Sequence, residues 1–330
     1  MFYRKLKDDV VKCELCPNYC VLKEGEYGKC RARKNVFGRL QSMVYGLPLG
    51  FAIDPIEKKP LFHFLPGTKI FSIGTSGCTL HCDFCQNPVS QEYPEDVHPV
   101  GMSPNDIVER AIYEGCNSIA YTYNEPTTFY EYAYDIAKMA RKKGLRNVMV
   151  TNGFINPEPT KELYQYIDAA NVDLKAFTDK FYKKFCLGSL KPVLNTLKLL
   201  KKMNVWFEIT NLLMEGLNDD PKDIKKMCEW IKKELGVNVP LFFTRFHPAY
   251  RMLDKQPTPV EKIVEAYEIA KKSGLKNVYT GNLKIDKYFQ TYCPECKAVV
   301  VERNYFDVIK NNLNNGKCPK CNTKIEGVWE

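Results

Sequence analysis

The chain has 330 residues, of which 45% are apolar and 26% are charged. This composition is typical of a packed globular protein and excludes disordered and fibrous chains, and the length suits two domains or one large barrel-type domain. No apolar run reaches the roughly 18 residues of a membrane helix, and the first residues lack the apolar core of a signal peptide. We therefore expect a cytoplasmic protein without membrane contact.

The formal net charge is +9, from 48 Lys and Arg against 39 Asp and Glu, and it counts all 14 cysteines as neutral thiols. Eleven of these cysteines fall into three tight groups. Cysteines that bind metals are thiolates, so bound metals would reduce the basic excess, and the charge gives little support for a nucleic-acid partner. In a chain that we expect in the reducing cytosol, clustered cysteines predict metal binding rather than disulfides.

Residues 1–66 contain the first cysteine group, Cys13, Cys16, Cys20 and Cys30, in a stretch rich in glycine and proline. Four cysteines in one short, loop-like segment predict a single metal site. Zinc and a second 4Fe-4S cluster are both compatible with four thiolates. The absence of a ferredoxin-type C-x2-C-x2-C run favours zinc slightly.

Residues 67–288 alternate short apolar runs with amphipathic segments, which predicts repeated β/α units. The predicted strands are 69–75, 118–122, 147–151, 170–174, 206–211 and 241–246, with a seventh at 277–280. The predicted helices are 104–115, 128–143, 158–168, 190–203, 221–235 and 259–273. This alternation demands parallel strands with right-handed crossovers, and too few strands are predicted for a closed eight-stranded barrel. In partial barrels and doubly wound sheets alike, ligands bind where the strands end.

The loop after the first predicted strand contains Cys78, Cys82 and Cys85, with spacing C-x3-C-x2-C. Ferredoxins use four cysteines to saturate a 4Fe-4S cluster, so three cysteines leave one iron open to another ligand. The alternative is a zinc site with His81 as fourth ligand. It is disfavoured because His81 is adjacent to Cys82 in the sequence, whereas zinc usually recruits a distant second pair of ligands.

This motif, with aromatic Phe84 before its last cysteine, resembles the radical S-adenosylmethionine (SAM) superfamily. The likeness continues in the polar segments after later strands, at 121–127, 151–154, 173–175, 212–219 and 246–248. Together these segments resemble the activating enzymes of glycyl-radical proteins, such as pyruvate formate-lyase activases. The whole chain, including Cys13–Pro17, Asp54–Leu61 and Gly327–Trp329, more closely resembles the radical SAM member of the AmmeMemoRadiSam system.

The resemblance implies an α/β fold in which residues 67–288 form a partial (β/α)6 TIM-like radical SAM barrel. It also implies a 4Fe-4S cluster on the catalytic Cys78, Cys82 and Cys85, with SAM bound at the open iron. The cluster would cleave SAM reductively to a 5′-deoxyadenosyl radical, which would take hydrogen from a protein or small-molecule substrate.

The resemblance further implies which residues bind SAM. Phe84 is a predicted cofactor contact, since residues beside this aromatic would contact the adenine. Asn124-Glu125-Pro126 occupies the place of a Gly-Gly-Glu segment that holds the methionine amino group. Tyr123 and Asn124 replace the two glycines, and only glycine takes positive φ freely. We therefore expect the contacts there to come from the side chains of Asn124 or Glu125.

Other implied pocket residues follow later strands. Asp173 and Lys175 alternate by two, so they share one face, where they would bind the ribose or the SAM carboxylate, or else form a buried ion pair. Asn152, Leu213 and His247 are the remaining predicted SAM contacts. For each of these three, a role in the core is the alternative.

Residues 289–330 contain two C-P-x-C turns, Cys293/Cys296 and Cys318/Cys321, separated by 21 residues. Two such turns direct four sulfurs at one tetrahedral point, which is the zinc-ribbon pattern. A segment this short cannot bury a sufficient core by itself, so we expect a structural zinc, with iron as the alternative. Basic residues here are diluted by acidic ones, which disfavours nucleic-acid binding.

The leading hypothesis is therefore an oxidoreductase of the radical SAM type that resembles glycyl-radical activases. It would need an external one-electron reductant of the ferredoxin or flavodoxin type, and the resemblance implies Memo-like and companion proteins as partners. One alternative is an RNA-modifying radical enzyme that holds RNA with its zinc modules. Another is a non-catalytic iron–sulfur relay, which the Asp173, Lys175 and His247 set disfavours because a relay needs no SAM pocket.

Overall fold

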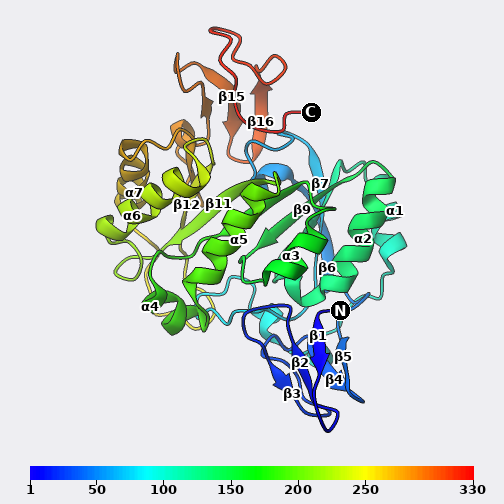
Figure 1. Cartoon of the computed structure of the whole chain (residues 1–330). Coiled ribbons are helices and arrows are strands. Elements are labelled where there is room, and N and C mark those ends of the chain that lie inside the picture. The colour runs from blue at the N-terminus through cyan, green and yellow to red at the C-terminus, as the bar shows by residue number, and fades with distance from the viewer.

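The computed structural model describes the whole chain, residues 1–330, and its centre is one eight-stranded sheet (Figure 1). The strand order is β13-β12-β11-β10-β9-β8-β7-β6, so neighbours in the sequence are neighbours in the sheet, and β6 and β13 form its two edges. The strands are β6 (Gly50–Pro55), β7 (Lys69–Gly74), β8 (Ser118–Tyr121), β9 (Arg146–Thr151), β10 (Ala169–Asp173), β11 (Trp206–Leu213), β12 (Leu241–Arg245) and β13 (Val278–Gly281). The strands from β7 to β13 are parallel, as predicted, and the sheet does not close into a barrel.

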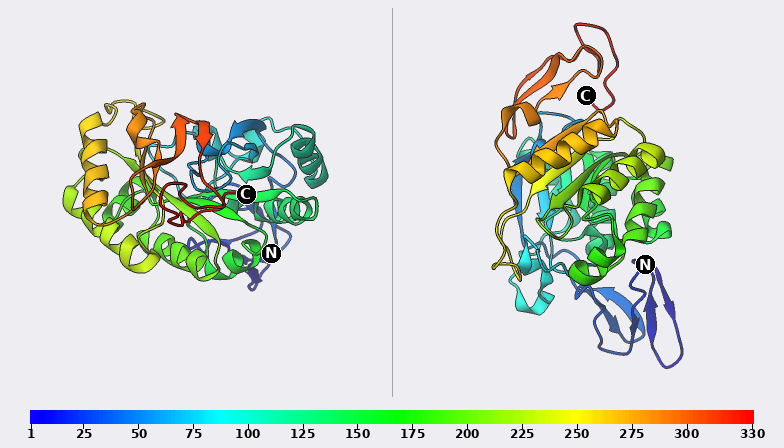
Figure 2. Two further views of the ribbon diagram at one scale, coloured as in Figure 1. Left: turned by 90° about the horizontal axis from the view of Figure 1, so that it is seen from above. Right: turned by 90° about the vertical axis from the view of Figure 1, so that its left-hand side faces the viewer.

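Helices follow the parallel strands and lie along one side of the curved sheet (Figure 2). They are α1 (Pro104–Tyr113), α2 (Tyr130–Lys142), α3 (Pro157–Leu163), α5 (Leu190–Lys202), α6 (Pro221–Trp230) and α7 (Val260–Lys272). Ser103 starts α1 with a capping box, in which its hydroxyl accepts from the Asp106 amide and the Asp106 carboxylate accepts from the Ser103 amide. All six predicted helices are confirmed.

Two elements near the central cysteines were not predicted. Strand β6 pairs antiparallel with β7 along its full length. It lies before residue 67, where the β/α region was predicted to begin. The short helix α4 (Asp179–Phe181) continues into a π-helical turn over Tyr182–Cys186. The carbonyls of Phe185 and Cys186 accept from the amides of Asp83 and His81 at 3.0 and 2.9 Å, so this turn supports the cysteine loop.

The N-terminal segment packs on the same core as the large sheet. It contains a three-stranded sheet of β1 (Tyr3–Lys5), β2 (Val11–Cys13) and β3 (Val21–Leu22), and a hairpin of β4 (Arg33–Val36) and β5 (Arg39–Ser42). Val11 and Leu22 belong to one cluster of 62 buried residues that also includes side chains of β7 and β11. The segment therefore shares its hydrophobic core with the rest of the chain.

The C-terminal segment lies at the opposite end of the molecule from the N-terminal one (Figure 1). Its strands are β14 (Thr291–Tyr292), β15 (Val299–Asn304) and β16 (Asp307–Asn311), in one antiparallel sheet. The fully buried Arg303 donates to the carbonyl of Phe62 at 2.6 Å and ties this sheet to the centre of the chain. The division of the chain at residues 66 and 288 stays a prediction. No helix combines the length and apolar character of a membrane span.

Candidate functional site

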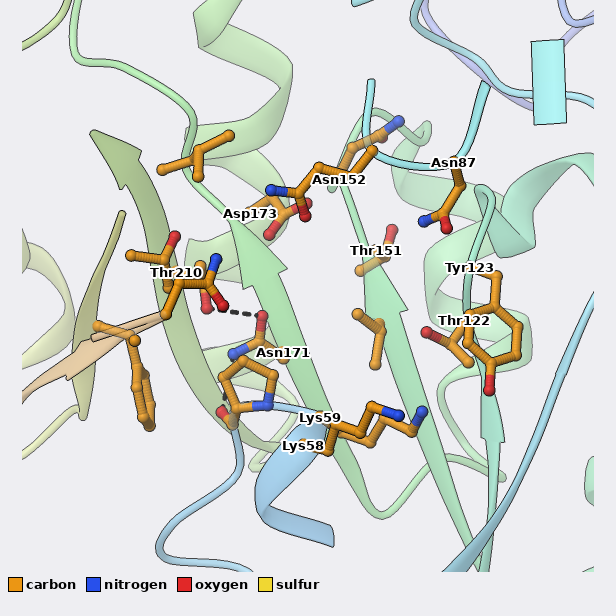
Figure 3. Close-up of a pocket in the computed structure, with 18 of the residues that line it drawn as sticks. Lys58, Lys59, Asn87, Thr122, Tyr123, Thr151, Asn152, Asn171, Asp173 and Thr210 are labelled. Carbon is orange, nitrogen blue, oxygen red and sulfur yellow. Dashed lines mark hydrogen bonds between the residues drawn. The ribbon is translucent and has the colours of Figure 1, made fainter. Parts of the chain in front are cut away.

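A cavity of about 500 Å³ lies along the inner face of the sheet (Figure 3). The loop after β7 contributes Cys78, Cys82 and Cys85 to its lining. The strands contribute a row of inward polar side chains, Thr151, Asn171, Asp173, Thr210, Thr244 and Thr280. The sequence therefore brings three thiols and a polar wall together where the predicted ligand site should be.

Asn124 holds the cysteine loop in place. Its amide nitrogen donates to the carbonyls of Gly77 at 2.8 Å and Ser76 at 3.2 Å, and its amide oxygen accepts from the Thr75 amide at 3.0 Å. The side chain lines the cavity as predicted, but its hydrogen-bonding capacity is already used by the loop. Asn124 is thus a positioning residue for the cysteines in this structure.

Glu125 is also bound within the protein. Its carboxylate is 1% exposed and accepts from the Thr127 hydroxyl at 2.6 Å, the Thr151 hydroxyl at 2.9 Å and the Asn152 amide at 2.8 Å. Burial raises the pKa of Glu125, and the bonds from Thr127 and Asn152 oppose that rise. The carboxylate joins the loop after β8 to the end of β9.

Asn152 contacts a cysteine of the motif directly. Its amide nitrogen lies 3.7 Å from Cys78 Sγ and 3.2 Å from the Thr79 hydroxyl, while its oxygen accepts from the Phe154 amide at 2.8 Å. Hydrogen bonds to sulfur tune the potential of an iron–sulfur cluster, so this position suits control of a bound cluster.

Tyr123 adopts a positive φ of 69° where the resembled family has glycine. Its hydroxyl donates to Asp54 at 3.2 Å, and the ammonium of Lys59 lies 4.9 Å from its ring centre. Lys58 and Lys59 both pair with Asp54, at 2.8 and 2.6 Å. Against the effect of burial, these two lysines hold the pKa of Asp54 well below its usual range.

Asp173 and Lys175 both line the cavity and form an ion pair at 2.9 Å. The Lys175 side chain is 14% exposed and that of Asp173 is 35% exposed, so the carboxylate keeps access to the cavity. Burial works against the charge of Lys175, but Asp173 and the neighbouring Cys82 and Cys186 outweigh it and raise the pKa of Lys175. Its ammonium also lies 5.8 Å from the ring centre of the buried Phe84, another predicted cavity residue.

Two predicted SAM contacts are not on the cavity wall. Leu213 is fully buried in the core, and Leu212 lines the cavity instead, because successive side chains of a strand point to opposite faces. His247 is exposed after the end of β12. The structure does not bring either residue to the cysteines.

Several cavity residues were missed by sequence reasoning, namely Lys58, Lys59, Asn171, Thr210, Thr244 and Thr280. For the strand positions, the available signal was a polar residue inside an otherwise apolar strand. Asn171 lies two residues before Asp173, so both side chains are on the same face of the strand. Asn171 accepts from the Thr210 hydroxyl at 3.0 Å, which joins β10 to β11 (Figure 3).

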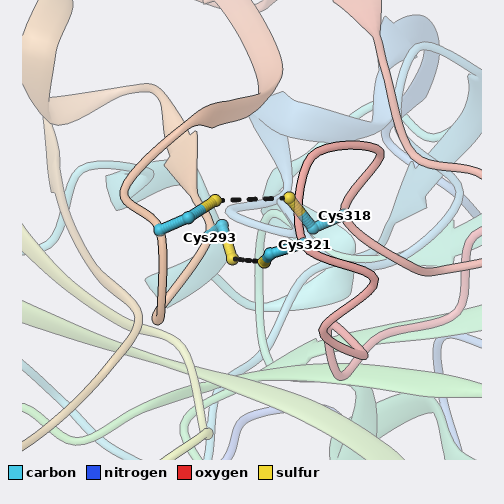
Figure 4. Close-up of side chains that lie close together, drawn as sticks. Cys293, Cys318 and Cys321 are labelled. Atoms are coloured by element: carbon cyan, nitrogen blue, oxygen red, sulfur yellow. Dashed lines mark hydrogen bonds between the residues drawn. The ribbon is translucent and has the colours of Figure 1, made fainter.

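The four C-terminal cysteines converge as predicted (Figure 4). Cys293 and Cys321 sulfurs are 3.5 Å apart, and those of Cys296 and Cys318 are 3.6 Å apart. Each turn has the same geometry: Lys297 and Asn322, which follow the second cysteines, have φ of 62° and 60°. A zinc–sulfur distance of about 2.3 Å places tetrahedral sulfurs about 3.8 Å apart, so this site fits one metal ion.

Comparison with known proteins gives the family. Residues 72–231 match the radical SAM superfamily. An uncharacterized protein of Methanocaldococcus jannaschii is 45% identical over 331 residues, which cover 99% of this chain and 98% of that protein. The chain belongs to the radical SAM superfamily. The fold agrees: the crystal structure of Streptococcus suis SuiB bound to S-adenosylmethionine matches with a TM-score of 0.52 at 13% identity, over 69% of this chain and 53% of that one.

More distant relatives of this radical SAM protein have named activities. A putative glycyl-radical enzyme activating enzyme of M. jannaschii is 29% identical over 47% of this chain and 65% of its own length. The pyruvate formate-lyase-activating enzyme of Staphylococcus epidermidis is 24% identical over 63% of this chain and 91% of its own length. The family implies a 4Fe-4S cluster and SAM, and three thiols of one loop in a cavity that also carries polar strand residues fit both groups.

Proposed function

We propose that this protein cleaves SAM reductively at a 4Fe-4S cluster and uses the 5′-deoxyadenosyl radical to take hydrogen from a protein or small-molecule substrate. The observation that carries the proposal is that Cys78, Cys82 and Cys85 line one cavity of about 500 Å³ together with polar side chains of the strands. When bound, the cluster supplies one electron and an open iron for SAM. The distant relatives support a glycyl-radical-activase type of oxidoreductase.

The residues around the cavity would orient SAM and exclude water. Asp173 presents a partly exposed carboxylate to the cavity, which suits a bond to the ribose hydroxyls or to the SAM amino group. Phe84 offers an apolar surface for the adenine. Asn124 and Asn152 would keep the cysteine loop in a fixed position while SAM binds and leaves.

The remaining parts of the chain support that role. We propose that the open sheet with its helices is a partial (β/α)6 TIM-like barrel extended by β13. We propose that Cys293, Cys296, Cys318 and Cys321 hold a structural zinc in a zinc ribbon. The electron would come from an external reductant of the ferredoxin or flavodoxin class, and Memo-like companion proteins are candidate partners.

The test is anaerobic reconstitution followed by measurement of bound iron and of 5′-deoxyadenosine formed from SAM and a strong reductant. Cys82→Ala should abolish 5′-deoxyadenosine formation while the protein stays folded, because it removes one of the three cluster ligands. Cys116→Ala is the matched control, since Cys116 is equally buried but lies after α1, away from the cavity. Cys82→Ala protein that forms 5′-deoxyadenosine at the wild-type rate would contradict the proposal.

A further inference from the structure

The four N-terminal cysteines form a site of their own. Cys13, Cys16, Cys20 and Cys30 together line one small cavity. The backbone amide of Lys29 donates to Cys20 Sγ at 3.4 Å. Such an N–H···S bond stabilises a thiolate that is bound to metal.

The spacing of the sulfurs separates this site from the C-terminal one. Among all His, Cys, Asp and Glu side chains, only the four C-terminal cysteines bring three or more donor atoms within 4.8 Å of one another. No three of the N-terminal sulfurs therefore lie within 4.8 Å of one another, and the same holds for the sulfurs of Cys78, Cys82 and Cys85. A single zinc draws its sulfurs to about 3.8 Å from one another, given zinc–sulfur bonds of about 2.3 Å. The cysteine sulfurs that bind a 4Fe-4S cluster lie farther from one another, because four irons lie between them.

The site also lies directly behind the central cysteine loop. The amide of Cys78 donates to the carbonyl of Cys30 at 3.2 Å, and the side chain of Asn18 donates to the carbonyl of Thr79 at 2.8 Å. Gly77 has φ of 93°, and a Cβ there would lie 2.6 Å from Ala32 Cβ, so the two loops are in close contact. Thr79 lines the N-terminal cavity itself.

We propose that Cys13, Cys16, Cys20 and Cys30 bind a second 4Fe-4S cluster, which passes electrons to the cluster on the central cysteines. An external reductant of the flavodoxin class would be oxidised by one electron, reducing the N-terminal cluster from the 2+ to the 1+ state. That cluster would return to 2+ as the central cluster takes the electron. The relay role rests on the proposed function, whereas the second cluster itself does not.

Metal content gives the first test. Full-length protein, reconstituted anaerobically with iron and sulfide and then desalted, should hold about eight irons and about one zinc per chain. Four irons and two zincs would overturn the proposal, because zinc would then occupy the N-terminal site. Failure of the proposed function would not produce that result, since metal counting does not require SAM cleavage.

Variants locate the second cluster. The triple variant Cys78→Ala, Cys82→Ala, Cys85→Ala should keep about four irons and a reduced-cluster electron paramagnetic resonance signal. Adding Cys16→Ala to that variant should remove both, whereas adding Cys116→Ala, the buried control, should remove neither. A folded triple variant without iron would overturn the proposal, and circular dichroism and gel filtration establish the folding.

Electron delivery is tested with two reductants. Cys16→Ala protein that retains its central iron should lose 5′-deoxyadenosine formation with reduced flavodoxin but retain it with dithionite, a small ion that can reach the central cavity. Equal rates for the variant and the wild type with flavodoxin would overturn the relay. An equal loss with both reductants would also overturn it, because the change would then lie in the central site.

Discussion

Tyr123 illustrates how single residues around the cysteine loop replace glycine. A non-glycine residue with left-handed φ costs about 1–2 kcal/mol, and Tyr123 takes φ of 69°. Its side chain gains a hydrogen bond to Asp54 and a cation–π contact with Lys59. The neighbouring Asn124 adds an amide that fixes the loop. Side chains thus supply the contacts here that a glycine backbone could not.

Asn124→Ala should loosen the cysteine loop. The substitution leaves the amide of Thr75 and the carbonyls of Ser76 and Gly77 without their partner. We expect a loss of about 1–3 kcal/mol in the free energy of unfolding, measured by urea titration of the apo protein, and faster iron release to a chelator. Asn87→Ala, at an exposed asparagine on the same cavity wall, should change neither. Equal effects from both variants would contradict a positioning role for Asn124.

Asp173→Asn tests whether the cavity carboxylate contacts SAM. If it does, SAM should bind about 1.5–3 kcal/mol more weakly, the value of a charged hydrogen bond. Calorimetric titration of SAM into the cluster-loaded protein measures this. The alternative is a purely structural pair with Lys175, in which case loss of one charge destabilises the apo fold by about 3–5 kcal/mol. A large fall in apo melting temperature with unchanged SAM affinity would remove Asp173 from the site.

At the scale of elements, the N-terminal segment is tied to α2 by a buried ion pair. Arg33 donates to both carboxylate oxygens of Glu131, at 2.6 and 2.7 Å, and the terminal amine of Met1 adds a contact at 3.1 Å. The Arg33 side chain is 3% exposed. Although burial raises the pKa of Glu131, Arg33 outweighs it and lowers that pKa to about 2.

Glu131→Gln should therefore destabilise the protein, by about 3–5 kcal/mol, because Arg33 stays buried without a counter-charge. In the wild type, the pKa of Glu131 is lower in the folded than in the unfolded state. The stability from this pair is therefore present above about pH 4.5 and lost as the pH falls toward 2. Urea titrations at several pH values measure both effects. Glu229→Gln, in the exposed pair with Lys225 at 3.8 Å, is the control and should change stability by less than about 1 kcal/mol.

The regular elements could be predicted because their signals are local. The strands from β7 to β13 are short apolar runs, and helices such as α1 and α7 have apolar periodicity with clear ends. Strand β6 was missed because its only buried side chain is the charged Asp54, so it lacks a buried apolar run, and because it pairs antiparallel with β7 at the sheet edge. The π-helical turn at 182–186 has no distinct sequence pattern. It depends on contacts with the cysteine loop.

The candidate site could be predicted only in part for a related reason. The cysteine spacing and the polar residues after strands located the cavity. The partners of Asn124, Glu125 and Tyr123 come from segments distant in the sequence, and a pattern along the chain does not encode them. Whether Leu212 or Leu213 lines the cavity depends on which of the two points to the inner face of β11. The resemblance alone did not determine this.

At the scale of the molecule, the two cysteine-rich terminal segments lie at opposite ends of the sheet (Figure 1). The N-terminal site touches the loop that holds the central cysteines, whereas the C-terminal sheet packs near residues 57–63. This arrangement places the N-terminal cysteines beside the cavity that the central cysteines line. The C-terminal cysteines lie at the far end of the open sheet.

The far end depends on a buried charge cluster. Arg303 is 3.7 Å from Glu57, and both side chains are fully buried. Glu208 accepts from the amides of Phe62 and His63 at 2.9 and 2.8 Å. Burial raises the pKa of both Glu57 and Glu208 to about 7, although Arg303 opposes the rise. Two acids in one junction therefore titrate near neutral pH.

This cluster predicts how the whole molecule responds to pH. Because the pKa of Glu57 is higher in the folded than in the unfolded state, the folded chain binds more protons between about pH 4.5 and 7. The free energy of unfolding should thus fall as the pH rises through that window, by up to about 3 kcal/mol for Glu57. Glu57→Gln cannot titrate, so its stability should depend less on pH. Urea titrations of both proteins at pH 5.5 and 8 measure the difference, and parallel changes in the two would show that Glu57 remains ionised in the folded protein throughout.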